Sequence, residues 1–192
     1  YHGVVKCALG WASWKTYLGR PEGDNLRRCA MRQLANGLSA VDHDEDALAV
    51  EEADLSMERR LGAPEEHLLS NLANLAISYG QVGRLEQAVG MLRDVYSGSL
   101  RLYGEDDYRA LRAANNYAAS LKDQDSFEEA RLLLRKTLPV ARRVLGESNR
   151  ITLTMRKIYA EALYDDDSST PDDFREAVAT LEEMARTVRR VL

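Results

Sequence analysis

Cysteine is scarce in this chain of 192 residues, which contains only Cys7 and Cys29. Two cysteines are too few for a disulfide framework, and no neighbouring Cys or His completes a zinc site. No apolar run approaches the roughly 20 residues that a membrane-spanning helix needs, and the N-terminus lacks the pattern of a signal peptide. We therefore expect a soluble protein with a cytoplasmic location and no membrane insertion.

Positive charge is also in short supply. The chain has 26 Lys and Arg against 31 Asp and Glu, a formal net charge of −5. This balance gives no overall attraction for phosphate backbones, and no repeated set of aromatic or basic side chains is available to stack bases. We expect no nucleic acid among the partners.

The groups that carry out catalysis or hold metals are isolated along the chain. His2, His43 and His67 are far apart in the sequence, and no Ser or Cys lies in a nucleophile motif. The acidic stretches 42–46 and 165–173 lack the spacing, central Gly and terminal Glu of a calcium loop. The sequence therefore predicts no catalytic residue, no metal site and no cofactor.

What the chain does contain is an internal repeat. Leu61-Gly62 recurs as Tyr103-Gly104 and as Leu145-Gly146, each pair 42 residues after the one before. Leu18-Gly19 precedes the first of these pairs by 43 residues. An apolar residue followed by Gly is typical of a helix end, because Gly tolerates the left-handed conformation there. The pairs therefore predict the ends of successive structural units.

Between these pairs, apolar and small residues follow helical spacing. The segments 67–80 and 108–121 place them at i, i+3, i+4 and i+7, and a second such segment follows each after a short polar turn. Each unit therefore predicts an antiparallel pair of amphipathic helices. One such hairpin cannot cover both of its apolar faces, so neighbouring hairpins must stack. The expected fold class is all-α, an α-solenoid of stacked antiparallel helix hairpins.

Two groups of aromatic side chains are expected to pack against these hairpins. Phe127 and Phe174 occupy the same place in successive units, beside alanines that let the helix backbones approach. Trp11 and Trp14 are three residues apart and share a helix face, so we expect them to bury against the next hairpin.

The period also predicts where the units begin and end within a single array, 1–192. The expected bounds are 1–17 for the second helix of a preceding unit, 18–60 for an irregular unit, 61–102 and 103–144 for regular units, and 145–191 for the last. The last unit carries an acidic insertion of five residues between Tyr164 and Phe174, which we expect to be a surface loop. The chain begins at Tyr1 and reaches the next repeat position at Leu192. We therefore expect it to be a fragment of a longer chain.

These units resemble tetratricopeptide repeats, and among them the 42-residue kind found in kinesin light chains. The resemblance is carried by the segments "LGAPEEHLLSNLANLAISYGQVGRLEQA" and "YGEDDYRALRAANNYAASLKDQDSFEEARLLLRKTL", and it is clearest over residues 61–192. The His-Pro that follows Leu-Gly in kinesin light chains is missing here. The resemblance implies a right-handed superhelix whose first helices line a concave surface, on which a partner peptide lies.

Six polar side chains on the first helices are the candidates for that surface. They are the residues Arg32, Asn36, Asn74, Arg112, Asn116 and Lys157. Asn74 and Asn116 occupy the same place in successive units, and an amide can hold a peptide backbone through its donor and its acceptor. The set is basic and amide-rich within an acidic chain, which favours an acidic or C-terminal peptide. The alternative is that these Arg and Lys lie on ordinary solvated helix faces.

The function that follows from the resemblance is a non-catalytic, kinesin light chain-like scaffold or adaptor that binds a partner peptide in the concave groove. Two alternatives stay open. One is a structural subunit of a larger assembly, with the groove or ends permanently packed, and the other is a regulatory repeat region of a multidomain enzyme or nucleotide switch. Exposed apolar faces at the ends of the array would favour the structural subunit. In each case we expect the chain to be part of a larger complex or a longer chain.

Overall fold

The structure is a computed structural model that describes residues 2–189, and Leu192, the last repeat position, lies outside the described residues. Contacts divide the chain into two compact units, Tyr1–Ala88 and Val89–Leu192. Within residues 2–189 there are nine helices: α1 (His2–Tyr17), α2 (Asn25–Ser39), α3 (Asp44–Arg60), α4 (Glu65–Gln81), α5 (Leu85–Tyr103), α6 (Tyr108–Asp123), α7 (Phe127–Leu145), α8 (Arg150–Tyr164) and α9 (Pro171–Arg189). The helices predicted over 67–80 and 108–121 are α4 and α6.

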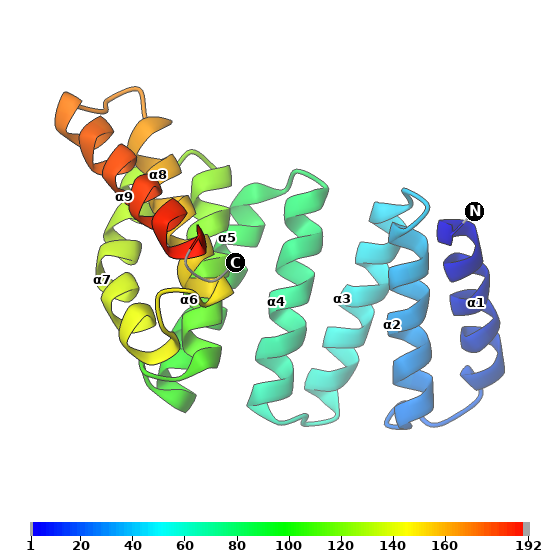
Figure 1. The fold of residues 1–192 in the computed structure, drawn as a ribbon. Helices are drawn as coiled ribbons and strands as arrows, with labels where there is room; N and C mark the ends of the chain where they lie inside the picture. The colour runs from blue at the N-terminus through cyan, green and yellow to red at the C-terminus, as the bar shows by residue number, and fades with distance from the viewer. Residues whose placement is uncertain (1, 190–192) are drawn as a thin grey trace. The chain divides into compact units, whose positions relative to one another are not determined.

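In the first unit, the helices α1 to α4 lie side by side in chain order, each packed against the next (Figure 1). The core between α2 and α3 is made of small and branched apolar side chains. Ala30 and Leu34 on α2 and Ala47, Leu48 and Leu55 on α3 are all buried. Alanines let the two helix backbones approach, and the leucines fill the space beside them.

The contact between α1 and α2 depends on glycine. A Cβ added at Gly10 would lie 2.6 Å from the Gln33 carbonyl oxygen, and one added at Gly37 would lie 2.7 Å from Cys7 Cα. No L side chain fits at either position without moving a helix backbone. These two glycines therefore set the close approach of α1 to α2.

In the second unit, α6, α7, α8 and α9 pack in sequence around one apolar core. Leu134 from α7 and Met155 and Leu163 from α8 are completely buried in it. A charged side chain is buried as well, since Arg156 on α8 has no exposed surface. Its guanidinium donates to Glu147 at 3.1 Å and to Glu183 at 2.7 Å, and both carboxylates are about half exposed.

Glycines with a positive φ angle follow the ends of several helices. Gly62, Gly104 and Gly146 have φ angles of 67°, 81° and 90°, as the Leu-Gly and Tyr-Gly pairs predict, whereas Gly19 is not left-handed. After Gly62, the Ala63 amide donates to the Glu58 carbonyl at 3.0 Å, the bond of a Schellman helix end.

The turns inside the hairpins end in the same conformation. Asp42, Gly83 and Asp125 all have positive φ angles, and each is followed by an amide that donates to the carbonyl five residues before it. A short polar residue can therefore replace glycine at this position, because Asp tolerates the left-handed region better than most residues.

Two predictions of burial are wrong. Trp11 is 51% exposed, because α1 turns the face that holds Gly3, Cys7 and Gly10 toward α2 and Trp11 lies off this face. Phe174 is 47% exposed, because it lies on a side of α9 that no described helix covers.

The acidic insertion after α8 is mostly exposed, and one contact ties it to α7. Asp166 accepts a hydrogen bond from Arg131 at 2.9 Å, and the Arg131 side chain is buried on α7. The Ser168 hydroxyl and amide also bond to Asp166 and, ahead of the Arg131 charge, hold the pKa of its carboxyl below the ordinary value. The insertion is therefore tied to α7 by a charge-assisted contact.

Candidate functional site

A hollow of the first unit lies between α2 and α4, with α3 as its floor. We call it the α2–α4 hollow. Its volume is about 510 Å³. The polar side chains that line it are Arg32, Asn36 and Ser39 from α2, Glu51 and Asp54 from α3, and Asn71, Asn74, Ser78 and Gln81 from α4.

Helical spacing explains why these side chains face one space. Arg32 and Asn36 are one turn apart on α2, so they lie on the same side of that helix. On α4, the sequence places Asn71, Asn74 and Ser78 at intervals of three and four residues, which again makes one stripe. Three of the six predicted site residues, Arg32, Asn36 and Asn74, are thus brought together in this hollow.

The floor of the hollow adds two carboxylates that are not among the six predicted site residues. On α3, Glu51 is three residues after buried Leu48, and Asp54 is seven residues after buried Ala47, so both keep helical spacing with the buried face. Acidic residues in the positions of an apolar stripe were the signal that could have found them. Glu58 continues the same stripe and is also buried.

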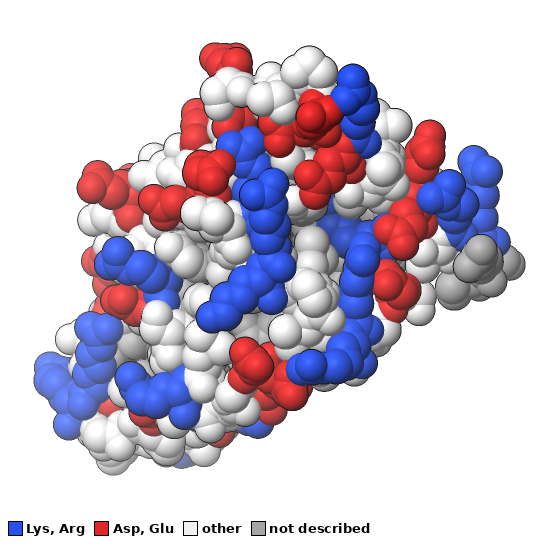
Figure 2. Space-filling model, turned by 90° about the vertical axis from the view of Figure 1, so that its left-hand side faces the viewer, with Lys and Arg blue, Asp and Glu red and all other residues white. Residues whose placement is uncertain are grey.

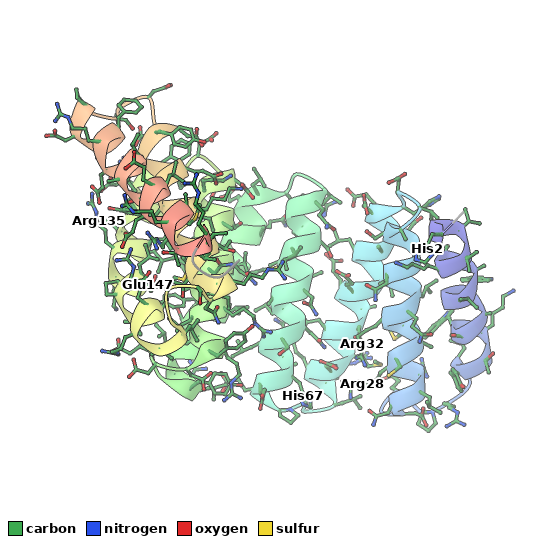
Figure 3. The ribbon with its side chains drawn as sticks, in the orientation of Figure 1. His2, Arg28, Arg32, His67, Arg135 and Glu147 are labelled. Atoms are coloured by element: carbon green, nitrogen blue, oxygen red, sulfur yellow. The ribbon has the colours of Figure 1, made fainter. Side chains whose placement is uncertain are left out.

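The charges on the floor are paired unevenly. Arg28 and Arg32 project from α2 toward α3 (Figure 3). Arg28 forms an ion pair with Glu58, which also accepts from Asn71. Arg32 is 3.7 Å from Asp54, longer than a hydrogen bond. The α2–α4 hollow therefore carries two carboxylates against one guanidinium among its lining residues.

Burial raises the pKa of both floor carboxyl groups. For Glu51 the loss of hydration is the main cause, a hydrogen bond with Ser78 acts in the opposite direction, and the charge of Asp54 raises the pKa further. For Asp54 the loss of hydration outweighs the charges of Arg32 and Arg28. The nearby arginines therefore do not fully compensate the two acids.

The other three predicted residues lie in the second unit. Arg112 is exposed on α6, and Asn116 is half-buried there and accepts from the Asn115 amide at 3.3 Å. Lys157 on α8 is exposed and lies 3.4 Å from Glu161, one turn further along the helix. A single groove that holds all six residues stays a prediction.

Basic side chains elsewhere in the second unit are also matched by acids. On α7, Arg135 lies near Glu176, and Arg142 pairs with Glu183 at 3.3 Å. Figure 2 shows Lys and Arg lying among Asp and Glu on the face that it displays.

Within residues 2–189, no three His, Cys, Asp or Glu side chains are placed to hold a metal ion. His2 on α1 and His67 on α4 are on separate helices (Figure 3), and His43 pairs with Asp46 at 3.2 Å. Cys7 and Cys29 are both free thiols. Among the described helices, none has the length and apolar character to cross a membrane.

Comparisons with known proteins agree with this geometry. Residues 67–143 match the family model described as tetratricopeptide repeat. Two solved structures of Podosopora anserina kinesin light chain-like proteins with nearly identical TPR-like repeats superpose with TM-scores of 0.76 and 0.77. They are 20% and 18% identical to this chain, cover 97% and 98% of it, and are themselves covered to 87% and 86%. BtubC (BKLC) from P. vanneervenii superposes with a TM-score of 0.78 at 17% identity, over 100% of this chain and 75% of its own.

Residues 67–143 therefore match tetratricopeptide repeats, and the chain has the fold of an array of such repeats. Its solved structural neighbours are kinesin light chain-like proteins, and at these identities they share its fold. No curated protein sequence matches the chain. The predictions of an all-α fold of stacked hairpins and of a tetratricopeptide repeat array are confirmed, whereas the bounds of the repeat units and the binding residues stay predictions.

Proposed function

We propose that the chain is a non-catalytic scaffold that binds a partner peptide in the α2–α4 hollow. The observation that carries the proposal is a hollow of about 510 Å³ lined by the amide side chains of two first helices of successive hairpins. Tetratricopeptide repeats generally mediate protein interactions, and the kinesin light chain-like fold supports an adaptor role. The proposal includes the cytoplasmic location that is expected from the sequence.

The amides suit an extended peptide. Asn36 and Asn74 are exposed at opposite sides of the hollow, and neither amide bonds to another described side chain. Each amide offers two donors and an acceptor, so it can bond to the N–H and the C=O of one peptide unit. Ile77 adds an exposed apolar surface beside Asn74 that can pack against a peptide side chain. In the second unit, we keep the prediction that Arg112 and Lys157 bind an acidic peptide.

A selection experiment tests the scaffold function. A random dodecapeptide library displayed on phage is selected on the immobilised protein, and the enriched peptides are synthesised and titrated. Asn36→Ala combined with Asn74→Ala removes two hydrogen bonds of about 1 kcal/mol each, so we expect binding to weaken roughly 30-fold. Gln33→Ala is the matched control, because Gln33 is exposed on α2 and does not line the hollow. Enriched peptides that bind the double variant as well as the wild type would contradict the proposal.

Exposed apolar side chains support a second candidate, the structural subunit. Val4, Val5 and Leu9 on α1 are exposed, as are Phe174 and Val178 on α9. In a larger assembly these faces would be covered by neighbouring chains. This candidate predicts that the tagged full-length protein is isolated in a stoichiometric complex, which Val178→Lys disrupts. Isolation as a monomer would remove it.

A further inference from the structure

The floor of the α2–α4 hollow holds acceptor atoms that the protein itself does not satisfy. Asp54 is 5% exposed, and its Oδ1 atom has no hydrogen-bond partner among residues 2–189. Oε2 of Glu51, one turn earlier on α3, has no partner among them either. A buried carboxylate oxygen without a donor is costly, and such groups are rare in folded proteins. Both residues line the same hollow, so the donors of a partner bound there would satisfy these oxygens.

The surrounding cations do not supply those donors. Arg32 reaches only to 3.7 Å from Oδ2 of Asp54, and its side chain is 43% exposed. Arg28 is engaged by Glu58. From α4, the hollow receives only neutral polar and apolar side chains. The hollow therefore lacks one positive charge and at least two well-directed N–H groups.

The chemistry of the missing group follows from these needs. Its donors must reach two separate carboxylates, and it must carry a positive charge to balance them in a poorly hydrated space. A guanidinium has five N–H donors in a planar fork and loses hydration more readily than an ammonium. Charge-assisted bonds from such a fork are about twice as strong as neutral ones. Arginine therefore fits the hollow better than lysine.

We propose that the α2–α4 hollow receives an arginine side chain of the bound peptide, whose guanidinium pairs with Glu51 and Asp54 while Asn36 and Asn74 hold the peptide backbone. The inference rests on the proposed function and names the chemistry of its partner. In this hollow, the partner segment is basic at one position, and an acidic peptide is excluded from that position by repulsion.

The test compares peptides that differ only in charge. Fluorescein-labelled dodecapeptides from the library selection are made with each arginine in turn replaced by citrulline, lysine or glutamate. Citrulline is nearly isosteric with arginine but neutral. Fluorescence anisotropy should show that citrulline at one position weakens binding at least tenfold, lysine weakens it less, and glutamate abolishes it.

Variants of the protein assign that preference to the floor. Glu51→Gln and Asp54→Asn should reduce the arginine-over-citrulline ratio to near one. Asp46→Asn removes the same charge from an exposed place on α3 and should keep the ratio. Circular dichroism checks the fold of each variant, and Glu51→Gln alone provides the answer if Asp54→Asn fails to fold.

The outcomes separate the two proposals. Peptides that need Asn36 and Asn74 but bind equally well with arginine and citrulline would overturn the arginine inference and leave the scaffold function standing. An arginine preference that survives Glu51→Gln would also overturn it. Peptides that bind the Asn36→Ala, Asn74→Ala double variant as tightly as the wild type would overturn the scaffold function itself.

Discussion

Gly37→Ala is expected to unpack α1 from α2. In a helix, Ala is normally more favourable than Gly by about 1 kcal/mol. At Gly37, however, the added Cβ would lie 2.7 Å from Cys7 Cα and 2.9 Å from the Lys6 carbonyl oxygen, and both are backbone atoms that no side-chain rotation can move. Overpacking of this kind typically costs 1–3 kcal/mol, so after the gain from Ala we expect a net loss of up to about 2 kcal/mol.

The loss should be concentrated in α1. Gly10 is the only residue of α1 that is fully buried, so little else holds this helix in place once its contact with α2 is strained. Hydrogen exchange followed by mass spectrometry should show reduced protection over residues 2–17 with little change over α6 to α8. Urea unfolding followed by circular dichroism measures the change in unfolding free energy.

Gly90→Ala is the matched control for this experiment. A Cβ at Gly90 on α5 meets nothing within 4 Å, so the same substitution should stabilise the protein by about 0.5–1 kcal/mol. If Gly37→Ala stabilises the protein as much as Gly90→Ala and leaves exchange in α1 unchanged, the close approach of α1 and α2 is not as described.

Two further predictions concern buried charge. Replacing both Glu147 and Glu183 by Ala should lower the free energy of unfolding by about 3–5 kcal/mol, because the buried guanidinium of Arg156 then loses its counter-ions. Arg156→Met should lower it by roughly 1–2 kcal/mol, because the two carboxylates left without a partner are about half exposed. Urea unfolding compares the two, and equal losses would refute the asymmetry. The second prediction concerns the dependence of stability on pH. Glu51 and Asp54 have raised pKa values in the folded state, so they bind protons more readily there than in the unfolded chain. Protonation of these two groups therefore stabilises the folded state. As the pH falls from 7 through the raised values toward the ordinary 4.5 and 3.8, the wild type should gain stability relative to a Glu51→Gln, Asp54→Asn variant, and a constant difference between the two would contradict this assignment.

The hairpin fold could be predicted from the sequence because its determinants are local. Helical spacing over 67–80 and 108–121 depends on neighbours within one or two turns, and the left-handed glycines after Leu61, Tyr103 and Leu145 depend on backbone conformation alone. Such signals survive in a single sequence. The first-helix positions of Arg32, Asn36 and Asn74 follow from the same spacing.

Features that depend on a partner helix were not predictable in this way. The roles of Gly10 and Gly37 need the register of α1 against α2, which spacing within one helix does not contain. Trp11 was expected to be buried from its shared helix face with Trp14 and Phe174 from its place in the repeat, but burial also needs a covering helix. Asp54 was not among the predicted site residues, because an acidic side chain is rarely buried without a partner and is therefore expected at the surface.

The three glycine joints Gly62, Gly104 and Gly146 have a consequence for how such a chain can change. An added Cβ at each would meet no atom within 4 Å. Each joint therefore requires only a positive φ angle, and it does not depend on the side chains of the hairpins that it connects. Hairpins can therefore be exchanged, duplicated or diversified between joints without a matching change at the connection. The connection itself therefore does not restrict which hairpins follow one another.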